Sequence, residues 1–293
     1  MIVILNSTLS DNLTGGYILK LELIPAYLKL EEYIEQEEQN QDIWKKIMVE
    51  PYWHIISKWA PFPEDYKMPL CHLSKEEAKA QLDELKKVDW KNMMEGFHAI
   101  CKALPKEDDD VMYIAIYPSK TDIPEGIYGT GVWGNIILNI NAVNRKFHKW
   151  LPFVFAHEYH HNVWGNYWYC LRYGEGLCGR LIENLIIEGE ADYFAESIFG
   201  NMHPSWHYGV KSEEEDRLWK KFKKALAIKL PPEEIGKYMF GCEEYGISQN
   251  AGYYFGIQLV REFMEKNQLY DIVTLLETPV DNIYKYYRDI GKL

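Results

Sequence analysis

Two histidines and a glutamate lie within the five residues His157-Glu158-Tyr159-His160-His161, at a spacing suited to metal chemistry. Residues four apart on an α-helix lie about 40° apart around its axis and one turn removed, so His157 and His161 could bind one metal ion. Glu158 could reach a water molecule held there and act as general base. His160, three residues after His157, is a competing ligand. The alternative interpretation is a surface helix that carries histidines without a metal.

A largely apolar segment further along the chain, 181–193, carries the carboxylates that would complete such a site. A catalytic zinc site uses three protein ligands and one open position, and a further carboxylate often orients a ligand histidine. Glu188 and Asp192, four residues apart, fit these two roles. Glu183 and Glu190 are competing third ligands, but neither has a carboxylate four residues later. The spacing therefore favours Glu188.

Two neighbouring tyrosines, Tyr253 and Tyr254, are candidates for a hydrogen-bond donor to the reacting oxygen. A phenol in that position stabilises negative charge that develops only in the transition state. Tyr253 is preferred because it directly follows Gly252, but the sequence gives little else to distinguish the two tyrosines. The alternative is that both are core tyrosines.

The elements that must position these residues follow from the hydrophobic pattern. The first hundred residues read as helical: residues 17–60 are interrupted at Pro25 and Pro51, and a further helix starts at Ser74 with a Ser74–Glu77 capping box. After a polar break at 105–110, β-rich segments are expected at 111–118 and 131–143. The expected helices that follow are roughly 147–164, 180–199, 213–228, 232–240, 250–266 and 281–289.

This order of helices, a few strands and again helices predicts an α+β fold, mainly helical, with a small sheet beside the helix that carries His157. The break near residue 108 predicts an N-terminal helical region over 1–108 and a second domain over 109–293.

Charge and cysteine content restrict the partners and the compartment. The net charge of −12 disfavours nucleic acid and anionic membrane surfaces as partners. Five widely spaced cysteines without a CxxC pair favour a reducing compartment over a disulfide framework. The N-terminal residues lack a secretory signal pattern, and no run of eighteen apolar residues occurs. A cytoplasmic protein is therefore expected.

Three motifs, HEYHH, LIIEGEADYFAE and AGYYFGIQLV, resemble a bacterial family of predicted zinc-dependent proteases, and more broadly the gluzincins, over roughly residues 110–265. The resemblance implies a zincin-like fold, zinc as cofactor and a peptide or protein as substrate. It implies that the zinc ligands are His157, His161 and Glu188.

The same resemblance implies that Glu158 is the general base and that the strand 131–141 is the sheet edge that binds an extended peptide. The chain departs from the family pattern at Glu190, where a small apolar residue is expected.

The leading hypothesis is therefore a zinc metallopeptidase in which Glu158 takes a proton from the attacking water. One alternative is a metal-binding regulatory or binding protein without turnover, although Glu158 argues against it because a structural zinc needs no base. Another is a hydrolase that acts on a non-peptide amide.

Overall fold

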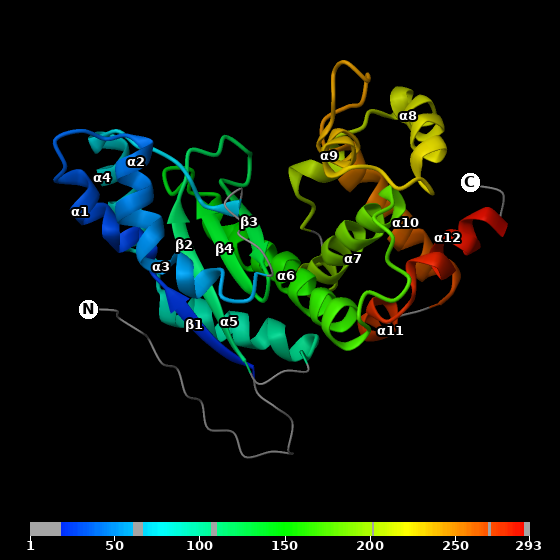
Figure 1. Cartoon of the computed structure of the whole chain (residues 1–293), viewed down its shortest axis with the longest axis horizontal. Coiled ribbons are helices and arrows are strands. Elements are labelled where there is room, and N and C mark those ends of the chain that lie inside the picture. Colours follow the sequence, from blue (N-terminus) through cyan, green and yellow to red (C-terminus); the bar gives the residue numbers. More distant parts are fainter. Residues whose placement is uncertain (1–18, 61–66, 107–109, 201, 269–270, 290–293) are drawn as a thin grey trace, which may run out of the picture. The chain divides into compact units, whose positions relative to one another are not determined.

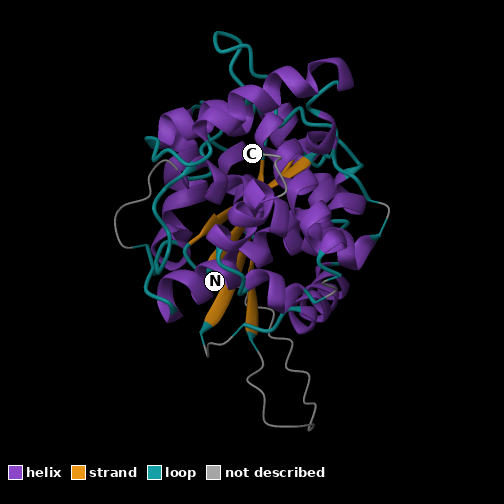
Figure 2. Ribbon diagram, turned by 90° about the vertical axis from the view of Figure 1, so that its right-hand side faces the viewer, coloured by secondary structure: helices purple, strands orange, loops and turns teal. Residues whose placement is uncertain are grey.

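The computed structural model describes residues 19–60, 67–106, 110–200, 202–268 and 271–289. The chain divides into two units, residues 1–166 and 167–293 (Figure 1). Helices dominate, and the strands form a single small sheet, so the expected mainly helical α+β fold is confirmed (Figure 2). Among the described helices, none combines the length and the apolar character needed to cross a bilayer. The N-terminal residues on which the absence of a secretory signal was judged lie outside the described residues.

The sheet of the first unit has the strand order β1-β2-β4-β3. Strands β1 (Lys20–Ile24), β2 (Val111–Pro118) and β4 (Asn135–Ile140) are parallel, and β3 (Ile127–Val132) pairs antiparallel with β4. All six residues of β4 are buried, as expected for a strand covered on both faces. A two-residue turn with positive φ at Trp133 and Gly134 joins β3 to β4.

Two sequence expectations about these strands are wrong. Residues 20–24 form a strand and not the start of a helix, because β1 pairs with the buried strand β2, with Leu23 opposite Ile114. The segment 131–141 is not the sheet edge: it contains β4, which lies between β2 and β3. The edge strand beside it is β3, which begins four residues earlier, at Ile127.

The helices of the first unit pack on this sheet and on one another. Ser74 and Glu77 form the expected capping box at the start of α4. A separate cap at Asp89 begins the next helix, α5. The helix bounds in this unit are α1 (Leu30–Ile34), α2 (Gln41–Trp44), α3 (Glu50–Ile56), α4 (Lys75–Leu85), α5 (Trp90–Ala103) and α6 (Phe147–Gly165).

The first unit extends across the polar break at 105–110, part of which lies outside the described residues. Strand β1, from before the break, pairs with β2, from after it. Phe97 of α5 stacks on Phe155 of α6 with ring centroids 3.9 Å apart, and the Tyr159 hydroxyl donates to the Leu104 carbonyl at 2.7 Å. The unit boundary at 166/167 therefore differs from the expected boundary at 108/109, because early and late segments share one core.

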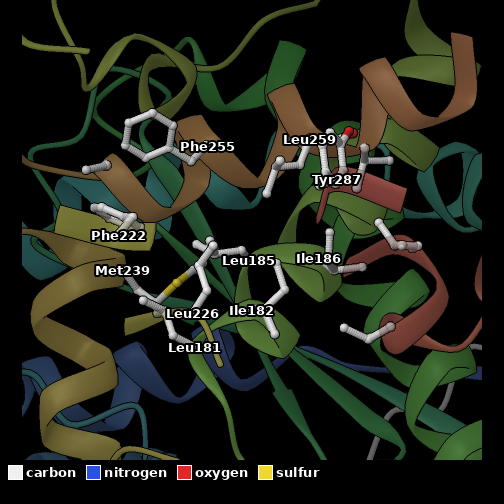
Figure 3. Close-up of a cluster of buried hydrophobic side chains, with 14 of the residues drawn as sticks. Leu181, Ile182, Leu185, Ile186, Phe222, Leu226, Met239, Phe255, Leu259 and Tyr287 are labelled. Carbon is white, nitrogen blue, oxygen red and sulfur yellow. The ribbon is translucent and has the colours of Figure 1, made fainter. Parts of the chain in front are cut away.

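The second unit is a helical assembly with its own buried core. Figure 3 shows how side chains of α7, α8, α9, α10 and α12 converge there, among them Leu185, Phe222 and Phe255. The expected helices are found with ends shifted by at most a few residues. Their bounds are α7 (Leu181–Phe199), α8 (Ser212–Ala225), α9 (Pro232–Phe240), α10 (Ala251–Lys266) and α12 (Val280–Asp289). A short helix, α11 (Ile272–Leu276), was not expected.

Helices α7 and α10 approach closely at two glycines. A Cβ atom on Gly189 would lie 2.5 Å from the carbonyl carbon of Gly256, and one on Gly256 would overlap the carbonyl oxygen of Leu185. Contacts this short leave no room for any side chain. The two glycines therefore fix the distance between the helix that carries Glu188 and the helix that carries Tyr253.

Candidate metal centre

Helix α6 brings the two histidines of the HEYHH motif together. The Nε2 atoms of His157 and His161 lie 3.0 Å apart, and the rings are nearly perpendicular with centroids 4.6 Å apart. Two nitrogens bound to one tetrahedral zinc at 2.0–2.1 Å would be about 3.3 Å apart. The pair therefore fits a shared metal ion. His160, the competing ligand, is completely buried and is not part of this pair.

Glu158 lies against the edge strand β3. A Cβ atom on Gly129 would lie 2.5 Å from Glu158 Oε1 and 2.6 Å from Cδ, and one on Gly131 would lie 3.5 Å from Oε2. Only glycine at position 129 leaves room for the Glu158 side chain, which is 93% buried. The arrangement holds a carboxylate at the edge of the sheet, one residue from the histidine pair.

Backbone groups of β3 are available to side chains from outside the sheet. The Lys67 ammonium donates to the carbonyl oxygen of Gly131 at 3.0 Å. Tyr128 on the same strand is 42% exposed. The strand that runs beside Glu158 is therefore also a strand at which further hydrogen bonds can form.

In the second unit, the carboxylates of α7 have different surroundings. Glu183 accepts hydrogen bonds from the backbone N–H groups of Cys178, Gly179 and Arg180 and from Arg180 Nε, which ties it to the start of the helix. Because these hydrogen bonds occupy its carboxylate oxygens, Glu183 is excluded as a competing ligand. Glu188 is partly buried. Burial raises the pKa of Glu190 well above its usual range.

Asp192 is fully buried and accepts hydrogen bonds from two residues of its own unit. Trp206 Nε1 donates to both carboxylate oxygens, at 3.2 and 3.0 Å, and His207 Nε2 lies 2.8 Å from Oδ2. Neither partner was identified from the sequence. No spacing signal could have revealed them, since they lie 14 and 15 residues from Asp192 outside its helix.

Glu196, one turn after Asp192, joins the same group. It contacts His203, His207 and Arg261. Burial alone would raise the pKa of Glu196, but its contacts with His207, Arg261 and His203 and the charge of Arg261 lower it. Burial likewise opposes the charged form of His207, but Asp192 and Glu196 outweigh it and raise the pKa of that imidazole.

The two tyrosines of α10 point to different neighbours. Tyr253 lies near Phe240, with ring centroids 6.0 Å apart. Tyr254 faces α8, where burial first and then the Glu215 carboxylate raise the pKa of its phenol. Tyr254 therefore has the Glu215 carboxylate of α8 as a partner.

Comparison with known proteins identifies a similar protein and a family. A protein of Bacillus subtilis (strain 168) described as "Uncharacterized protein YjfC" is 30% identical over 168 residues, which is 54% of this chain and 54% of that protein. The chain thus spans about half the length of the curated relative that it matches. No solved structure matches it significantly.

Residues 89–285 match a family described as "Predicted Zn-dependent protease (DUF2268)". This match runs from α5 to α12 and includes the histidine pair, Glu158 and the carboxylates of α7. Because it covers more than half of the chain, the protein belongs to this family of predicted zinc-dependent proteases.

Proposed function

We propose that this protein is a zinc-dependent peptide hydrolase in which His157, His161 and Glu188 bind the metal and Glu158 is the general base. The observation that carries the proposal is the geometry within the first unit, where the two histidine Nε2 atoms lie 3.0 Å apart beside a carboxylate that lies against the edge strand. Glu188 completes the ligand set as the α7 carboxylate that the spacing favours, with Asp192 four residues later, whereas Glu183 is bound at the start of the helix. Family membership supports zinc as the metal.

The chain's own residues have distinct tasks in this reaction. A bound zinc ion would lower the pKa of a coordinated water and polarise the substrate carbonyl. Glu158 takes a proton from the attacking water and passes it to the leaving amine. Its contact with Gly129 restricts where that carboxylate can lie, which favours proton transfer along one direction. Tyr253 donates a hydrogen bond to the carbonyl oxygen as negative charge develops on it.

The substrate is proposed to bind as an extended peptide along β3. An edge strand offers backbone donors and acceptors to such a peptide, and Glu158 lies against this strand. This assignment replaces the expected edge at 131–141. Backbone pairing also favours a peptide over a small amide, because a small amide has no strand to pair.

The substitution Glu158→Gln tests the proposal. Glutamine keeps the shape and the contact with Gly129 but cannot accept a proton, so peptide hydrolysis should fall by roughly 10²–10⁴-fold. Zinc content should be unchanged, because Glu158 is not a ligand. The measurement is hydrolysis of a broad peptide library together with zinc content per chain. Equal hydrolysis by both proteins would exclude Glu158 as the base, and no hydrolysis by either would favour a metal-binding protein without turnover.

A further inference from the structure

A second group of metal-binding side chains lies entirely within the second unit. It consists of Glu196 near the end of α7, His203 in the following loop and His207 in the short 3-10 helix Ser205–Tyr208. One ligand atom from each of the three lies within 4.8 Å of the other two. The Nδ1 atoms of His203 and His207 lie 2.8 and 3.4 Å from the same oxygen, Glu196 Oε1.

His207, the buried histidine of this group, has a carboxylate near each of its two ring nitrogens, Asp192 near Nε2 and Glu196 near Nδ1. The His207 side chain is 3% exposed, and its Nε2 lies 2.8 Å from Asp192 Oδ2. Because a carboxylate only accepts hydrogen bonds, the proton belongs on Nε2, and a neutral imidazole then has a lone pair on Nδ1. That Nδ1 atom is buried, makes no hydrogen bond and points towards Glu196. The Nδ1 lone pair of His207 and the Glu196 carboxylate are both acceptors. Their arrangement therefore requires a cation between them, either a proton or a metal ion.

The charges around the group favour a cation. Asp192 and Glu196 contribute two negative charges, and Arg261 offsets one of them by donating to both oxygens of Glu196, with Nε at 3.0 Å. A carboxylate has about four lone-pair directions, so Glu196 can accept from Arg261 and still bind a metal. His203 is 41% exposed, which opens the group to ions from solution.

We propose that Glu196, His203 and His207 form a second zinc site, separate from the proposed catalytic centre. Two imidazoles and a carboxylate with one position open to water are a ligand set that zinc accepts. Asp192, on the far nitrogen of His207, would fix the ring tautomer as carboxylates do behind zinc-bound histidines. The site would tie the loop after α7 to that helix and would leave one coordination position open to water.

Zinc content per chain tests the proposal on the full-length protein. The proteins are saturated with zinc, dialysed and analysed for bound metal. Wild type should hold two zinc ions, and His203→Ala should hold one. The double variant His157→Ala/His161→Ala should also hold one, and adding His203→Ala to it should remove that ion. His54→Ala, which removes an exposed histidine of the first unit, should leave the content at two.

Two outcomes would overturn the second site: a folded double variant without zinc, or unchanged zinc after His203→Ala. If the double variant fails to fold, the single His203→Ala variant still decides the question, and Glu196→Gln repeats the test with little change in shape. The two proposals fail independently. Wild type with one zinc that is lost in His203→Ala but kept in His157→Ala/His161→Ala would support this site and contradict the catalytic one.

Discussion

The two units use glycine for close contacts of different kinds. In the first unit, Gly129 of β3 leaves room for a side chain, the carboxylate of Glu158. In the second unit, Gly189 and Gly256 leave room for backbone, so that α7 and α10 can touch. The first contact positions the proposed general base, whereas the second positions two helices. Glycine is therefore needed beside a single side chain in one unit and between two backbones in the other.

This difference predicts which property each substitution changes. A new methyl group at Gly129 meets a side chain that can rotate away, so the strain is relieved by moving Glu158. A new methyl group at Gly256 meets a helix backbone, which cannot move without separating the two helices. The first change should reduce catalysis and the second should reduce stability.

The largest effect is expected from Gly129→Ala. The added Cβ would lie 2.5 Å from Glu158 Oε1, so the carboxylate must leave its position. Displacement of a catalytic group by about 1 Å can cost about 10²-fold in rate, and we expect a loss of this size in kcat/KM for peptide hydrolysis. Zinc content and thermal stability should change little, because the three atoms nearest to the added Cβ all belong to Glu158 and not to the histidine pair.

Gly131→Ala is the matched control for this prediction. Its added Cβ would lie 3.5 Å from Glu158 Oε2, an ordinary van der Waals distance, on the same strand and beside the same side chain. Activity should stay within a few-fold of wild type. Similar losses in the two variants would mean that the strand tolerates no side chain at all and that the Gly129 contact has no special role.

The next largest effect is expected from Gly256→Ala. Overpacking a core typically costs 1–3 kcal/mol, and the upper part of that range, about 2–3 kcal/mol, is expected here because the obstructing atom is the carbonyl oxygen of Leu185. Chemical denaturation measures the free energy of unfolding. Gly189→Ala should behave alike, although it also neighbours the proposed ligand Glu188. Unchanged stability in both variants would show that the helices can separate at no cost.

The sequence predicted the parts of the site that lie within one helix turn and missed the parts that tertiary structure assembles. The spacing of His157 and His161 fixes their geometry once a helix forms, so the pair was visible. The link between Asp192 and His207 depends on how a loop folds back on α7, and no local pattern records it.

Local sequence features also explain why the strands β1 and β3 were not predicted. Strand β3 contains Gly129 and Gly131, which lower its strand propensity, so the sequence pointed to the buried β4 instead. In β1, apolar residues at 19, 23 and 27 fit a helical period, and only pairing with β2 selects the strand. Both errors come from long-range pairing that outweighs local preference. The unit boundary was missed for the same reason, since β1 joins a sheet built mainly from later residues.

The smallest effect is expected at helical glycines that have space for an added methyl group, one in each unit. Gly96 in α5 of the first unit has no neighbour within 4 Å of an added Cβ, and Gly236 in α9 of the second unit has only Phe240 Cδ2 at 3.8 Å. Alanine in a helix interior is favoured over glycine by up to about 1 kcal/mol, because glycine loses more backbone freedom on folding. Gly96→Ala and Gly236→Ala should therefore each raise the free energy of unfolding by about 0.5–1 kcal/mol and leave hydrolysis and zinc content unchanged. Denaturation curves and peptide assays on the two variants measure this. A loss of stability in either one would mean that steric room around a glycine does not decide its role, and the contrast between Gly129 and Gly256 would lose its physical basis.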